Sequence, residues 1–154
     1  MSLFDPLPLP PEIVGREPTP VGILLISGTY ERAHYALVAA TAAAATARPV
    51  VLFATNAGVR AFLAARPDGT PGWTTLAHYG GAAKRDEELR GRGVAGFAEL
   101  LAAAKELGVR LIVCESGLKA EGLVPEQLDD TLEGEVAGIV TFLAETEGGQ
   151  ILTL

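Results

Sequence analysis

The sequence predicts a single-domain α/β protein built around a mainly parallel β-sheet. Short apolar runs of strand length alternate along the chain with segments of helical character, which is the order of βαβ units. These runs are almost continuously apolar, as in strands that are buried on both faces. The 154 residues fit one domain, and 49% of them are hydrophobic, so the chain can build a core without disulfides.

Five segments are expected to be strands. The first three, residues 21–27, 50–54 and 109–114, are the most apolar and alternate with helical segments. A short strand over residues 135–137 and a closing strand over residues 150–154 complete the set.

The clearest helix is predicted over residues 94–107, because five of its apolar side chains recur at helical spacing. They are Val94, Phe97, Leu100, Leu101 and Ala104. Gly108 follows as the expected C′ residue. An alanine-rich helix is expected over residues 30–47, with Thr29 as its N-cap. Further helical segments are expected at residues 57–65 (with Asn56 as N-cap), 116–121, 125–130 and 138–145.

Two segments are expected to lie outside the regular structure. Residues 1–20 contain six prolines and predict an extended N-terminal arm, which leaves residues 21–154 as the folded domain. Residues 68–93 predict a long irregular loop, of a length typical of lids and binding loops.

Composition excludes several classes of function. A net charge of −7 argues against a nucleic-acid partner, since phosphate binding requires clustered lysine and arginine. One cysteine and two histidines do not suggest a metal site or a disulfide, and a lone thiol suits a reducing cytoplasm. Gly91, Gly93 and Gly96 have dinucleotide-binding spacing, but they follow a charged run rather than a strand, so no cofactor is predicted. Neither a signal peptide nor a membrane span is evident.

Cys114 is the leading candidate for chemistry because it ends a predicted strand just before a predicted helix. In open α/β sheets this edge commonly carries the functional site. The amides of Ser116 and Gly117 and the charge of Lys119 would favour a thiolate, whereas Glu115 would oppose it. The alternative is that Cys114 packs as a small buried hydrophobe.

Other residues at the predicted edge are candidates for an anion pocket. Ser27 and Gly28 join the first strand to the first helix, and Asn56 follows the second strand. The alternative for each is an ordinary turn or helix cap. His78 lies in the long predicted loop and would act as a general base if that loop folds over Cys114.

Residues around Cys114 resemble a known family. The segment 108–118, then 121–123 and 136–143, together with the opening run 22–27, is similar to the DsrE/DsrF/TusD-like family of small sulfur-relay proteins. The resemblance covers most of the chain from about residue 21 onward. Its sharpest element is the Cys114-Glu115 pair at the end of a strand.

This resemblance implies a three-layer α/β/α domain with a five-stranded parallel sheet, and assembly into homo-trimers or hexamers. It implies that Cys114 takes sulfane sulfur as a persulfide from a donor protein and passes it to an acceptor. Some family members hold further cysteines, and this chain has none. A lone cysteine can accept and donate a persulfide but cannot resolve it internally. The alternatives are a non-catalytic module that binds a small ligand and a structural subunit of an oligomer.

Overall fold

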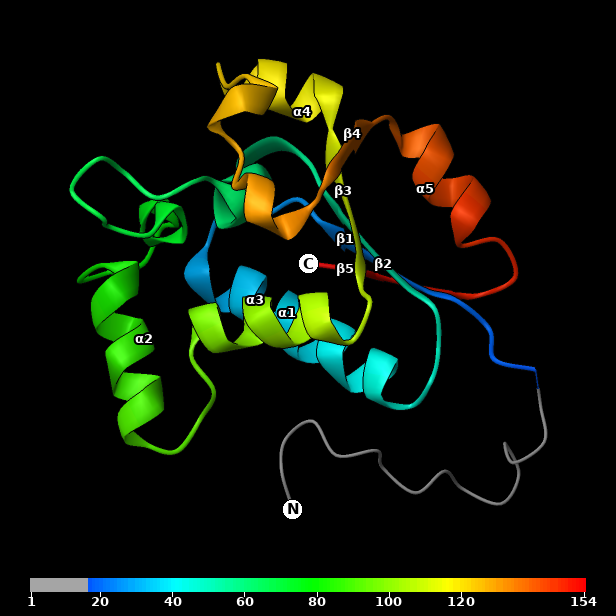
Figure 1. Ribbon diagram of the computed structural model, residues 1–154, viewed down its shortest axis with the longest axis horizontal. Coiled ribbons are helices and arrows are strands. Elements are labelled where there is room, and N and C mark those ends of the chain that lie inside the picture. The colour runs from blue at the N-terminus through cyan, green and yellow to red at the C-terminus, as the bar shows by residue number, and fades with distance from the viewer. Residues whose placement is uncertain (1–16) are drawn as a thin grey trace.

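The computed structural model describes residues 17–154, and in this part the five expected strands form a single sheet (Figure 1). The strand order is β4-β3-β2-β1-β5, and every neighbouring pair is parallel. The α/β prediction is therefore confirmed. The strands are β1 (Val21–Leu25), β2 (Val50–Ala54), β3 (Arg110–Cys114), β4 (Glu135–Ala137) and β5 (Gln150–Thr153).

Two helices cover one face of the sheet. The helices α1 (Tyr30–Ala45) and α3 (Phe97–Glu106) lie side by side over the strands (Figure 1). Alternate residues of β1, Ile23 and Leu25, point toward them and are completely buried. Ala33, Ala36 and Ala40 of α1 are also completely buried. Small side chains at these positions let α1 approach the sheet closely, which explains the alanine-rich sequence.

In the described part of the chain, a single short helix, α5 (Ile139–Glu145), covers the opposite face (Figure 1). It packs where β1 has a glycine: a Cβ on Gly22 would lie 2.8 Å from the Phe142 ring and 2.7 Å from a Thr146 methyl. Phe142 is completely buried and meets the Phe53 ring at a centroid distance of 5.2 Å. The absence of a side chain at Gly22 thus provides the space that α5 needs.

The predicted loop over residues 68–93 is wrong in its second half, which forms the helix α2 (Ala82–Gly91). This helix buries only Ala82 and Asp86, so its sequence has no apolar stripe to reveal it. Tertiary hydrogen bonds hold it instead. The Asp86 carboxylate accepts from Tyr30 Oη at 2.7 Å and from the Phe97 amide at 2.6 Å. Arg90 Nε also donates to it, at 3.0 Å.

Several predicted boundaries and caps need correction. The predicted helix 57–65 is a 3₁₀ helix, η2 (Asn56–Phe62), and Asn56 is its first residue rather than its cap. Helix α3 begins at Phe97 rather than at residue 94, because Asp86 binds the Phe97 amide at its start. Thr29 occupies the N-cap position of α1 without a side-chain cap bond. Gly108 has a φ of 77°, as a C′ residue requires.

The remaining elements are short. They are η3 (Gly72–Thr75), α4 (Glu115–Ala120), η4 (Pro125–Gln127) and η5 (Asp130–Leu132). Most of the predicted N-terminal arm, residues 1–16, lies outside the described residues. Its last part is held by Arg48, whose guanidinium donates to the Thr19 carbonyl at 2.9 Å and to the Thr19 hydroxyl at 3.0 Å.

Candidate functional site

Cys114 is the last residue of β3, and α4 begins at the next residue. The strand ends directly in a helix, so the thiol lies at the carboxyl edge of the sheet. Its side chain faces the α5 side and is 5% exposed. It shares a small apolar cluster with Val51, Phe53, Ile112 and Phe142.

Polar groups surround the remainder of the sulfur. Cys114 Sγ and Ser116 Oγ are 3.1 Å apart, and Ser116 is exposed to solvent. Burial raises the pKa of the Cys114 thiol, but hydrogen bonds from the hydroxyls of Ser116 and Thr55 lower that pKa. The amides of Gly117 and Ser116 lower the pKa further, so it lies below the ordinary value of a cysteine. The site therefore favours a thiolate.

Gly117 makes this arrangement possible. A Cβ at this position would lie 2.6 Å from Thr55 Oγ1 and 2.6 Å from the Asn56 amide nitrogen. Any larger residue would push the start of α4 away from the turn after β2. The glycine thus brings Thr55 against the residues that follow Cys114.

An ion pair also holds the end of α4 against η2, the 3₁₀ helix that follows Thr55. Arg60 of η2 contacts the carboxylate of Glu121, the residue after α4, at 3.0 Å. Both side chains are partly buried, so solvent screens this pair less than a pair on the open surface. The pair limits the movement of α4 relative to the turn that carries Thr55.

The structure brings most of the predicted edge residues into neighbouring turns. Asn56 lies against Gly117 and adopts a φ of 49°, a left-handed conformation that asparagine tolerates better than most residues. Gly28 lies against the next residue of that turn, since its Cβ would be 2.6 Å from Ala57 Cβ. The Ser27 hydroxyl is used locally, bonding the Thr29 amide at 3.2 Å and the Thr29 hydroxyl at 3.0 Å.

His78 and Glu115 have other partners. His78 Nδ1 lies 2.5 Å from a carboxylate oxygen of Glu31, in the first turn of α1. Glu115 is exposed and pairs with Lys119 at 2.9 Å, an interaction that lowers the pKa of its carboxyl group. Neither of these two pairs includes the Cys114 sulfur.

Sequence reasoning missed Thr55, which directly follows β2. Ala54 of β2 pairs in register with Val113 of β3, so Thr55 and Cys114 come one position later on adjacent strands. Polar residues that directly follow neighbouring parallel strands meet at one edge of the sheet. That rule would have found Thr55 as well as Asn56.

The described residues also bear on metals and membranes. Between residues 17 and 154, no three histidine, cysteine, aspartate or glutamate side chains gather closely enough to hold a metal ion. In the same part of the chain, no helix has the length and apolar character needed to cross a bilayer.

Comparison with models of known protein families shows the family of this chain. The model of the DsrE/DsrF-like family matches residues 21–152, which include the whole sheet apart from the end of β5. The chain belongs to the DsrE/DsrF-like family. This family is associated with sulfur relay between protein partners. A search of curated proteins finds no match to the chain.

Proposed function

We propose that this DsrE/DsrF-like protein carries sulfane sulfur as a persulfide on Cys114 and passes it to a partner protein. The observation that supports the proposal most directly is the Ser116 hydroxyl, which lies 3.1 Å from the sulfur and, together with Thr55, favours its anion. A thiolate is the nucleophile in such exchange, and a low pKa also makes it a good leaving group.

The reaction consists of two exchanges without net oxidation or reduction. The Cys114 thiolate attacks the outer sulfur of a donor persulfide, forming a new S–S bond as the donor S–S bond breaks. The donor leaves as a thiolate, and the transferred sulfur keeps its proton, so Cys114 becomes a persulfide. An acceptor thiolate then attacks the outer sulfur on Cys114. A new S–S bond forms to the acceptor, the S–S bond to Cys114 breaks, and Cys114 leaves as a thiolate.

Mass spectrometry tests this proposal. The intact protein is incubated with a sulfane-sulfur donor, and the peptide that contains Cys114 is analysed. We expect a gain of one sulfur atom on Cys114 that a free thiol acceptor removes. If an accessible, unmodified Cys114 gains no sulfur, the proposal is wrong. Ser116→Ala should slow the gain, whereas Thr74→Ala in η3 should leave it unchanged.

A second candidate function follows from the burial of Cys114. With 5% of its surface exposed and aromatic neighbours on one side, the thiol is also placed as a packing residue would be. In that case the protein is a binding module or a structural subunit. Titration of the native protein with a thiol reagent separates the two, because a packing thiol reacts only on unfolding.

We also propose that the protein acts in the cytoplasm as a homo-trimer or hexamer, with separate sulfur donor and acceptor proteins. Exposed apolar side chains support assembly: Val140 and Leu143 of α5 are 77% and 52% exposed. All four side chains of the edge strand β5 are exposed as well. Surfaces of this kind commonly mark contacts between proteins. The alanine-rich α1, whose sequence is apolar over more than one face, or the segment 68–93 would provide a further contact. Solution mass measurements test the assembly.

A further inference from the structure

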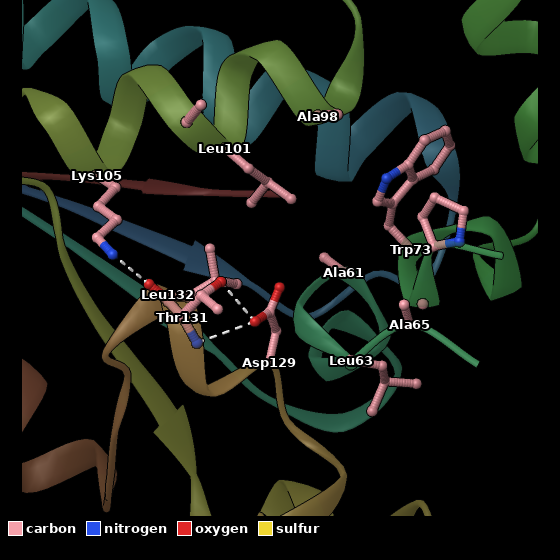
Figure 2. A pocket seen from close by; sticks show the side chains of 13 residues that line it. Ala61, Leu63, Ala65, Trp73, Ala98, Leu101, Lys105, Asp129, Thr131 and Leu132 are labelled. Carbon is pink, nitrogen blue, oxygen red and sulfur yellow. Dashed lines mark hydrogen bonds between the residues drawn. The ribbon is translucent and has the colours of Figure 1, made fainter. Parts of the chain in front are cut away.

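A groove of about 350 Å³ lies on the α3 side of the sheet, the face opposite to the one that the Cys114 side chain occupies. Its walls come from α3, η3, η5 and the end of η2 (Figure 2). They are mainly apolar, with Leu63, Leu101 and Leu132 contributing the larger aliphatic side chains. A volume of this size and an apolar lining are typical of small-molecule sites.

One wall of the groove carries an unused hydrogen-bond donor. Trp73 is only 8% exposed, and its ring stacks on Phe97 at a centroid distance of 5.1 Å. Within residues 17–154, its indole N–H has no acceptor, and because this nitrogen is not completely buried it remains available to a ligand in the groove. Figure 2 shows the nitrogen-bearing edge of the indole turned toward Leu101, across the groove.

The other side of the groove carries an unused acceptor. Asp129 Oδ1 accepts from the amide of Thr131 at 3.0 Å and from its hydroxyl at 2.6 Å. Among the described residues, no donor reaches Oδ2, and this oxygen points away from Thr131 in Figure 2. Lys105 does not neutralise it, since its ammonium binds the Thr131 carbonyl and lies 3.8 Å from Glu133.

We propose that this groove binds a small alkylamine that carries an aromatic ring. The ammonium group would pair with Asp129, the ring would lie among the leucines, and an oxygen at the far end would accept from the Trp73 indole. A ligand with these three features satisfies both unused polar groups and covers the apolar walls. The inference does not depend on sulfur transfer, because the groove and Cys114 lie on different faces of the sheet.

Fluorescence tests the proposal directly, since Trp73 is the one tryptophan in the chain. The protein is titrated with tyramine, which has an ammonium group, an aromatic ring and a phenol oxygen. The matched probe is 4-hydroxyphenylacetate, which has the same phenol but a carboxylate in place of the amine. Excitation at the red edge of tryptophan absorption avoids both probes. We expect a saturable change with tyramine and a much weaker one with the acid.

Asp129→Asn should weaken tyramine binding by about tenfold, because the amide keeps an oxygen for Thr131 but lacks the charge. The matched control is Asp130→Asn, which removes the same charge from the exposed neighbouring residue outside the groove lining. Circular dichroism and melting temperature establish that both variants are folded. The proposal is overturned if tyramine gives no saturable response, if both probes bind equally, or if the two variants weaken binding to the same extent.

Discussion

The two faces of the sheet are built very differently. Two long helices cover one face, and its core contains three aromatic rings, Tyr30, Trp73 and Phe97, in mutual contact. Within residues 17–154, the other face has α5 alone, over a cluster of five buried residues that includes Cys114. The first face therefore provides most of the buried apolar surface that stabilises the fold. The second face buries much less, which agrees with the roles proposed for Cys114 and α5.

The sharpest test of this difference removes one aromatic ring from each face. Phe97→Ala should lower the free energy of unfolding by about 4 kcal/mol, because Phe97 is completely buried among other rings. Phe142→Ala should cost about 3 kcal/mol, and it should also speed the reaction of Cys114 with thiol reagents. Chemical denaturation and thiol titration measure the two effects. Equal thiol reactivity in both variants would contradict the assignment of Cys114 to the α5 face.

A smaller effect is expected where the site is assembled. Gly117→Ala should destabilise the protein by about 2 kcal/mol, since the new Cβ meets the Asn56 backbone, which cannot give way. The thiol should also react more slowly near neutral pH as Thr55 moves away. Gly138→Ala is the control: apart from its chain neighbours, no described atom lies within 4 Å of a Cβ added there, and its φ is −100°. A similar loss of stability in both variants would rule out the close approach as the cause.

The next prediction concerns pH rather than stability. A lowered pKa means that the Cys114 thiolate persists to lower pH than in a free cysteine. Alkylation should therefore reach its plateau at lower pH in the native protein than in the unfolded chain. Thr55→Val removes one hydrogen bond to the anion, so the midpoint should move to higher pH. Thr55→Ser should restore it, and a midpoint that both variants leave unchanged would show that Thr55 has no electrostatic role.

The smallest effect on the fold is expected at the surface of α5, on the face of the sheet that has fewer buried residues. Val140→Asp changes a side chain that is 77% exposed, so the free energy of unfolding should change by no more than about 0.5 kcal/mol. The charge should nevertheless disrupt any assembly through α5. Sedimentation equilibrium compares the variant with Glu147→Gln, a conservative exchange of another exposed residue. If the unmodified protein is an oligomer and Val140→Asp has the same mass, the contact between subunits lies elsewhere.

The sequence predicted the sheet well because its strands are buried and carry continuous apolar runs. It located Cys114 correctly at a strand end, since a strand that ends before a helix start is visible in the residue pattern. It failed for α2, whose position depends on a buried carboxylate and its long-range partners, such as Tyr30 and the Phe97 amide. Periodicity cannot reveal such contacts. It missed Thr55 for a related reason, since its contact with the Cys114 site requires the register of β2 against β3.

The glycine beneath α5 has a consequence for motion. Gly22 accommodates the ring of Phe142, and that ring together with Thr146 provides the buried contacts of this helix and its C-cap. A seven-residue helix with so few anchors can detach while the rest of the domain stays folded. Amide hydrogens of α5 should therefore exchange with solvent much faster than those of α1. Because Phe142 shares the cluster around Cys114, each such excursion should expose more of the sulfur to solvent.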